Sequence, residues 1–192
     1  FTSKALNLPI AVANRPFELF LAIAMALSIV SFTLSYWFTL RPVLSILFIL
    51  TGIIQLIRIN NWHTLSTFKT PLLWSLHFAY LNMGIGYVSL GVSYYVDAVS
   101  FSSALHIITL GTIGTMILSM MSRVSLGHTA RPLKSNLWVN VSFSALISAA
   151  LMRFVLPLFN LPMLGYSLAV IGWVIGFGIF IIYYAPILMR AR

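Results

Sequence analysis

The sequence predicts an all-α protein, a polytopic transmembrane bundle of about six helices, and three observations support this prediction. Hydrophobic residues make up 60% of the 192 residues and charged residues only 7%, and the mean hydropathy is +1.02. The apolar residues form runs of roughly 20, the length that a helix needs to cross a bilayer. These runs lack the two-residue alternation of membrane β-strands, so helices are favoured over a barrel.

The six predicted spans are the continuous apolar runs of the chain, at residues 17–39, 43–57, 71–95, 102–121, 137–157 and 163–188. The second span has about 15 residues, and Arg41 and Arg58 at its ends can snorkel to extend it. Pro16, Pro42 and Pro71 each fall at the start of a span, where the missing backbone N–H costs nothing. We assign all six spans to a single transmembrane domain.

The distribution of Lys and Arg predicts the orientation. Nine of the eleven lie on one set of connectors, namely Lys4, Arg15, Arg58, Lys69, Arg123, Arg131, Lys134, Arg190 and Arg192. The opposite side holds only Arg41 and Arg153, so the positive-inside rule places both termini of this segment in the cytoplasm. The net charge of +9 is scattered over span ends and forms no continuous basic face. Nucleic acid is therefore not an expected partner. Membrane lipid is an expected partner because of the apolar spans.

The third span has a polar stripe within an apolar helix. His77, Tyr80, Gly84, Tyr87 and Gly91 follow a three-four spacing that puts them on one face. This face should contact protein, because glycines allow close helix packing and polar groups are poorly tolerated toward lipid. The chain has no cysteine, so a metal site must use His, Met, Tyr, carboxylate or backbone oxygen.

The polar segment from Met121 to Leu133 contains one histidine, His128, and two arginines, Arg123 and Arg131. Such a segment cannot sit in hydrocarbon, so we expect it at a membrane surface or lining a protected cavity. The backbone can turn sharply at Gly127 and direct His128 toward the bundle. The alternative is a plain connector whose basic residues fix orientation.

The other three histidines differ in how well their positions suit a functional role. His77, two turns into an apolar helix, is a candidate functional residue. His106 is one turn into the fourth span and is either a ligand or a satisfied helix-end histidine. His63 follows an interfacial tryptophan in a polar connector, and we expect it to be solvated and without a cofactor role.

Depth limits how the histidines combine. His77 and His106 should differ in depth by roughly 20 Å and cannot share a metal. His77 and His128 lie on the same side and can converge on one metal or haem, with Arg123 or Arg131 available for haem propionates. His106 would then serve a second site or act alone.

Several motifs of this chain resemble one family. Residues 121–133 read M-S-R-V-S-L-G-H-T-A-R-P-L and resemble the M-T-R-x-S-L-G-H-T-G-R-P-L signature of the NnrS family. Its P-L-L-W-x-L-H-x-x-Y segment is matched by Pro71 to Tyr80, its A-L-H-x-x-x-x-G-x-x-G-T run by Ala104 to Thr115, and the end of its P-F-F-T segment by Phe1 and Thr2. Ser122 and Ala130 stand where the signature usually has Thr and Gly, and both changes keep the imidazole and guanidinium groups.

The resemblance implies a bacterial inner-membrane protein that contains haem and copper and acts in nitric oxide metabolism, denitrification or nitrosative stress. It also implies that this chain is the C-terminal half of a protein of about twelve helices, whose N-terminal half is a partner, with nitric oxide or nitrosyl species as ligands. The expected cofactor-binding residues are His77, His106, His128, Arg123, Arg131 and Tyr80, and the three histidines are the expected metal ligands. No catalytic residue is identified.

Two other functions remain open from the residues alone. Polar stripes inside a helical bundle also suit a transporter or permease for a small or metal-bound solute, and a scaffold or sensor is the third alternative. The two acids, Glu18 and Asp97, both lie at span ends. No carboxylate is therefore expected within the membrane, which weakens proton-coupled transport and carboxylate-based hydrolysis.

Overall fold

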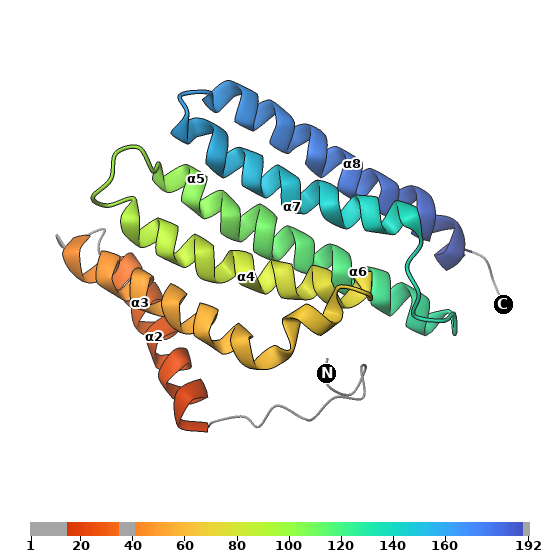
Figure 1. Ribbon diagram of the computed structural model, residues 1–192, viewed down its shortest axis with the longest axis horizontal. Coiled ribbons are helices and arrows are strands. Elements are labelled where there is room, and N and C mark those ends of the chain that lie inside the picture. The colour runs from red at the N-terminus through yellow and green to blue at the C-terminus, as the bar shows by residue number, and fades with distance from the viewer. Residues whose placement is uncertain (1–14, 35–40, 190–192) are drawn as a thin grey trace.

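The computed structural model describes residues 15–34 and 41–189, and this part of the chain is helical, with no strand (Figure 1). Its long helices are α2 (Arg15–Leu34), α3 (Arg41–Ile59), α4 (Pro71–Val92), α7 (Leu137–Leu158) and α8 (Pro162–Met189). A further rod consists of α5 (Phe101–His106), the π-helical segment η3 (Ile107–Gly114) and α6 (Thr115–His128). Two short 3₁₀ helices, η1 (Asn60–Trp62) and η2 (Thr64–Thr67), connect α3 to α4. The prediction of an all-α bundle of about six helices is confirmed.

Five of these six rods are long and apolar enough to cross a membrane, namely α2, α3, α7, α8 and the rod at Phe101–His128. The remaining helix, α4, has 22 residues and carries more buried positions than any other helix described. Figure 1 shows why: α8, α7, the α5–α6 rod, α4 and α3 lie side by side in that order, and α2 packs on α3. Because neighbouring helices cover α4, it tolerates polar residues that a lipid-facing helix does not.

Close helix contacts explain several of the glycines. A Cβ added to Gly52 of α3 would lie 2.7 Å from the carbonyl oxygen of Gly84 in α4, so the two backbones touch. The same holds between α8 and α7, where a Cβ on Gly172 would lie 2.9 Å from the carbonyl oxygen of Ala145. His77, Tyr80, Gly84 and Gly91 are buried, so the polar stripe of the third span faces protein as predicted.

The predicted end of the fourth span at Met121 is wrong, because α6 continues for two more turns to His128. Hydroxyl groups in this polar run bond back to the helix, as when Ser122 donates to the carbonyl oxygen of Leu118 over 2.8 Å. Gly127 is helical, and the chain turns later, at Ala130, whose φ is 48°. The prediction of a turn at Gly127 is therefore wrong as well.

The end of α6 is a Schellman motif. The N–H of Arg131 donates to the carbonyl oxygen of Leu126 over 2.9 Å, and that of Ala130 donates to Gly127 over 3.1 Å. The end of α7 has the same pair of bonds, with Asn160 at φ 61° in the left-handed position. Each motif satisfies backbone groups that the helix end would otherwise leave without partners.

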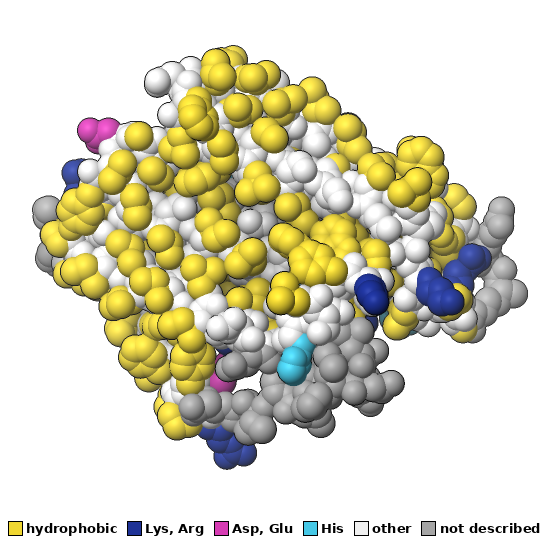
Figure 2. All heavy atoms as spheres, in the orientation of Figure 1, with side chains coloured by type: hydrophobic (Ala, Val, Ile, Leu, Met, Phe, Trp, Pro, Cys, Tyr) yellow, Lys and Arg dark blue, Asp and Glu magenta, His cyan; other side chains and the backbone are white. Residues whose placement is uncertain are grey.

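The surface of the described part agrees with a lipid environment. Figure 2 shows apolar side chains over most of one face of the molecule, with the dark-blue Lys and Arg side chains at its margins. Many large apolar residues of α2, α3, α7 and α8 are exposed. Such a continuous apolar surface is typical of a protein that contacts lipid tails. The structure does not describe residues 1–14, 35–40 and 190–192. The predictions for Phe1, Thr2, Lys4, Arg190 and Arg192 therefore lie outside the described residues.

Candidate functional site

A polar cluster forms where α2, α3 and α4 meet near the connector of η1 and η2. The guanidinium of Arg58 in α3 donates to both carboxylate oxygens of Glu18 in α2, with N to O distances of 2.6 and 2.9 Å. It also donates to the hydroxyl of Tyr80 in α4 over 3.0 Å. That hydroxyl in turn donates to the side-chain oxygen of Gln55. The two-pronged ion pair fixes the arginine and neutralises its charge.

His77 lies next to this cluster and is only 4% exposed. Its Nδ1 is 2.9 Å from the hydroxyl of Thr64 in η2. Trp62 of η1 lies edge-on to the His77 ring, with centroids 5.9 Å apart, and 4.4 Å from the ring of Tyr80. The guanidinium carbon of Arg58 lies 5.2 Å from the Trp62 centroid. The connector therefore covers His77 and fixes the orientation of its ring through Nδ1.

The connector can cover His77 because its backbone turns at His63. His63 adopts φ 52°, in the left-handed region, and this turn separates η1 from η2. Trp62 and Thr64, on either side of the turn, both face His77, whereas His63 itself is exposed. The exposure of His63 agrees with the predicted solvated position.

Arg123 of α6 lies at the same end of α4. Its Nη1 donates to the carbonyl oxygen of Leu72, in the first turn of α4, over 3.1 Å. Beyond it, His128 is the last residue of α6 and is exposed, and Arg131 is exposed in the following loop. Of the predicted residues, the structure thus brings His77, Tyr80 and Arg123 to one end of the bundle, with His128 and Arg131 further out.

The structure does not bring His77 and His128 to one depth. The contacts of Leu72 with Arg123 and of Asn82 with Gly111 show that α4 and the α5–α6 rod run in opposite directions. His77 lies five residues inward from Leu72 and His128 five residues outward from Arg123, which separates them by roughly 15 Å along the bundle. Imidazole nitrogens on one metal lie within about 4 Å of each other, given bonds of about 2 Å. Within residues 15–34 and 41–189 there is no group of three or more His, Cys, Asp or Glu that could hold a metal.

His106 lies toward the opposite end. Asn82 donates to the carbonyl oxygen of Gly111 over 3.4 Å, which sets the register between α4 and η3. His106 is then level with about Tyr87, roughly 15 Å from His77 along the bundle. Its Nδ1 lies 2.7 Å from the carbonyl oxygen of Ser102, so Nδ1 carries a proton. His77 and His106 therefore occupy separate places, as the sequence predicts.

His77, Tyr80 and the five residues that contact them or Arg58 form one group, the His77 cluster. Sequence reasoning missed these five residues, which are Glu18, Gln55, Arg58, Trp62 and Thr64. Two signals were present in the sequence. Gln55 is a polar residue inside an apolar span, three residues before Arg58, and such residues usually face a protein neighbour. Glu18 is one of only two acids in a chain with eleven cations, so an ion pair was a natural expectation.

The family described as NnrS protein matches residues 1–192. The chain belongs to the NnrS family. No curated protein and no solved structure matches it. Together with the five apolar helices, the family assignment identifies a multi-pass membrane protein.

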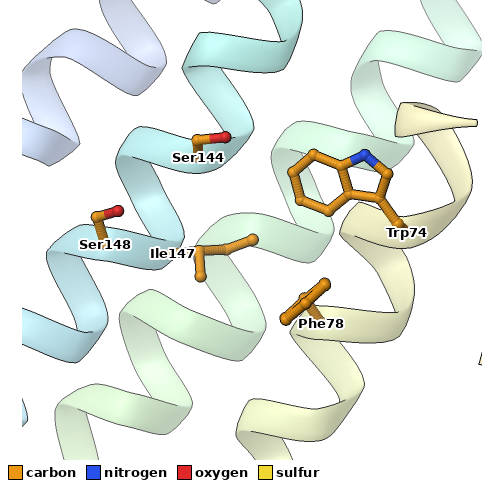
Figure 3. Close-up of a pocket in the computed structure, with 5 residues that line it drawn as sticks. All are labelled: Trp74, Phe78, Ser144, Ile147 and Ser148. Atoms are coloured by element: carbon orange, nitrogen blue, oxygen red, sulfur yellow. The ribbon is translucent and has the colours of Figure 1, made fainter. Parts of the chain in front are cut away.

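Two places in this NnrS protein are candidates for a haem site. A pocket between α4 and α7, with a volume of about 180 Å³, is lined by the residues labelled in Figure 3, which are Trp74, Phe78, Ser144, Ile147 and Ser148. It contains no histidine and is smaller than the roughly 300–1,000 Å³ of typical small-molecule sites, so it is not a haem pocket. At the other place, His77 supplies an imidazole, which binds haem iron, and Arg123 at the same end of α4 supplies a guanidinium, which binds propionates.

Proposed function

We propose that this NnrS protein is a haem-binding component of the bacterial inner membrane that acts in nitric oxide metabolism or the response to nitrosative stress. Copper is the second metal of the proposal, and nitric oxide or a nitrosyl species is the ligand. The observation that supports this most directly is the single buried imidazole, His77, held in a polar cluster inside an otherwise apolar bundle. A buried ionisable group in a membrane protein is a candidate functional site by default.

In this proposal His77 holds the haem iron, and Tyr80 and Arg123 belong to its surroundings. Haem would supply an iron centre that binds small ligands and transfers electrons. Thr64 positions the His77 ring through Nδ1, and Trp62 keeps water away from it. His128 lies further out than His77, and His106 lies at the other end of the bundle. These two histidines are therefore proposed as ligands of separate metal sites, and copper is one of the metals they would bind. Arg131 contributes charge at the His128 end.

The partners are proposed on the same basis. The exposed apolar helices contact membrane lipid, and the distribution of Lys and Arg supports an orientation with both ends of this segment in the cytoplasm. A further helical half of the protein would supply ligands that this chain lacks. Reporter fusions test the orientation: alkaline phosphatase fused within 129–135 should be inactive and one fused near Asp97 active, and the reverse pattern contradicts it.

The absorption spectrum of the purified protein tests the haem site. We expect a Soret band that His77→Ala abolishes or strongly shifts, because an axial imidazole sets the ligand field of the iron. Thr64→Val should leave haem bound and shift the reduction potential, since it removes the hydrogen bond at Nδ1. His63→Ala is the matched control, an exposed histidine of the same connector, and should change nothing. Loss of haem in His63→Ala with an unchanged spectrum in His77→Ala would contradict the assignment.

The same spectrum and metal analysis test the outer residues. His128→Ala and His106→Ala should each lower the copper content without removing the Soret band. Arg131→Gln should lower metal occupancy only mildly, by weakening one charge-assisted contact. A Soret band that vanishes in His128→Ala and persists unchanged in His77→Ala would instead make His128 the haem ligand.

One observation favours the transporter as a second candidate. The rod at Phe101–His128 is interrupted by eight π-helical residues, Ile107–Gly114, and such interruptions are frequent at functional sites. Transporters bind their substrates near mid-membrane, and Ile107–Gly114 lies inside this long rod and not at its ends. A purified protein without haem or copper that moves a solute across vesicle membranes would support this candidate against the haem protein.

A further inference from the structure

A buried arginine lies at the end of the bundle opposite His77. Arg153 of α7 is only 8% exposed. Its guanidinium carbon lies 3.8 Å from the ring centroid of Tyr166 in α8. Its Nη1 donates to the hydroxyl of Ser103 over 3.1 Å and its Nη2 to that of Ser102 over 3.2 Å, both in α5. Three helices therefore hold this guanidinium in place.

The charge of Arg153 has no carboxylate to balance it. The whole chain contains two acidic residues, Glu18 and Asp97. Glu18 is engaged by Arg58 at the other end of the bundle. Asp97 is exposed in the turn before α5, and the ion pair found in the described part of the chain is the one between Arg58 and Glu18. A buried charge without a counter-charge is energetically costly, so a counter-charge is expected here.

The hydrogen-bond donors around Arg153 outnumber the acceptors. Ser103 accepts hydrogen bonds from both Arg153 and the Ser100 hydroxyl, the latter over 2.8 Å. Ser102 accepts from Arg153. The hydroxyl protons of Ser102 and Ser103, with three of the five guanidinium N–H groups, therefore remain as donors. A group of donors around a positive charge complements an anion that offers several acceptor oxygens.

We propose that Arg153, Ser102 and Ser103 form a binding site for an oxyanion such as phosphate. The planar guanidinium matches the geometry of phosphate and carboxylate oxygens. Access is from the side of Ser102, which is exposed, and past Tyr166, which is 38% exposed. The site is separate from the proposed haem site at His77, which lies at the other end of the bundle, and its neighbour on α5 is His106, whose Nδ1 lies 2.7 Å from the carbonyl oxygen of Ser102.

The position in the bundle allows two sources of the oxyanion. Arg153 lies five residues before the end of α7, roughly 8 Å along the helix axis. This is close to the headgroup layer, which extends several ångströms beyond the hydrocarbon core. The phosphate of an anionic lipid and a free oxyanion in solution share the chemistry that the site recognises, and the experiment must separate them.

The first arm measures soluble phosphate. The full chain in bilayer discs of neutral phosphatidylcholine is titrated with inorganic phosphate at constant ionic strength, and the thermal unfolding midpoint is recorded. We expect phosphate to raise the midpoint of the native protein and of Arg41→Gln, a matched control that removes an exposed cation at the same end of the bundle. Arg153→Gln should lose the effect.

The second arm measures lipid. Native mass spectrometry of the protein in discs that also contain phosphatidylglycerol should show retained anionic lipid that is lost in Arg153→Gln and kept in Arg41→Gln. Ser102→Ala preserves the stacking on Tyr166 and should weaken binding about fivefold to tenfold, through loss of one charge-assisted contact. It keeps the test valid if Arg153→Gln fails to fold.

The outcomes separate the sources. Stabilisation by phosphate in neutral discs identifies a soluble oxyanion, and retention of anionic lipid alone identifies a headgroup. The proposal is overturned if neither probe distinguishes the native protein from Ser102→Ala and Arg153→Gln. It is also overturned if Arg41→Gln loses as much binding as Arg153→Gln, because the effect would then be general surface charge.

Discussion

The two arginine sites, around Arg58 and around Arg153, lie at opposite ends of the molecule and differ in what surrounds the guanidinium charge. Arg58 is paired with Glu18 and bonds to the Tyr80 hydroxyl, and its guanidinium carbon lies 5.7 Å from the Tyr80 ring. Arg153 has two serine hydroxyls and lies 3.8 Å from the Tyr166 ring. At the Arg58 site the carboxylate of Glu18 balances the charge. At the Arg153 site the positive charge has no carboxylate partner, and several N–H and O–H groups remain as hydrogen-bond donors.

This difference indicates how the two ends can serve different purposes. At the Arg58 site the polar groups satisfy one another, and the result is a rigid surrounding for His77. At the Arg153 site the charge is not balanced within the chain, so the site is suited to an outside anion. The two sites also use different helices, α2, α3 and α4 against α5, α7 and α8. Substitutions should therefore affect one without the other.

The largest expected effect comes from separating the helices of the Arg58 site. Gly52→Leu places a side chain where even a Cβ would lie 2.7 Å from backbone atoms of α4. We expect a loss of about 3 kcal/mol in the free energy of unfolding, at the upper end for overpacking, together with loss of the Arg58 contacts to Tyr80. Phosphate binding at Arg153 should persist.

Gly178→Leu is the control for this prediction. It makes the same change in α8, at a glycine with nothing within 4 Å of an added Cβ, and should cost little. Equal losses for the two variants, measured by unfolding in mixed micelles, would show that α3 and α4 are not in backbone contact.

The next effect contrasts the two tyrosines. The Tyr80 hydroxyl bonds to Arg58 and Gln55, whereas Tyr166 contributes its ring to Arg153. Tyr80→Phe should lower the free energy of unfolding by about 1–2 kcal/mol, because it leaves the buried Gln55 oxygen without its donor. Tyr166→Phe keeps the ring and should change it by less than about 0.5 kcal/mol. A larger loss in Tyr166→Phe would contradict the contrast between the sites.

A smaller effect is expected from the ion pair. Glu18→Gln removes the counter-charge of Arg58 and should cost about 1 kcal/mol, because both side chains are partly exposed, by 37% and 29%. Asp97→Asn, the change at the other acid, should cost almost nothing. If the two variants are equally stable over a range of salt concentrations, the ion pair does not stabilise the fold.

Much of the architecture follows from the sequence because it depends on the period and length of apolar runs. The helices and the protein-facing stripe of α4 were predictable in this way. The extension of α6 was not, because Ser122 and Ser125 read as loop residues until their hydroxyls are seen to be buried in the helix. The His77 cluster was only partly predictable, since Glu18 and His77 are 59 positions apart and nothing in their local sequence states that they meet.

The smallest expected effect concerns the left-handed residues that end α6 and α7, one at each end of the molecule. Ala130 has φ 48° and Asn160 has φ 61°. Alanine pays a steric cost in this region that glycine does not, whereas asparagine tolerates it. Ala130→Gly, which restores the residue that the NnrS signature usually has, should raise the free energy of unfolding by about 0.5–1 kcal/mol. Asn160→Gly should change it by less than half of that. The ranking is measured by unfolding of both variants beside the native protein, and a larger gain at Asn160 would show that the strain lies at the end of α7 instead.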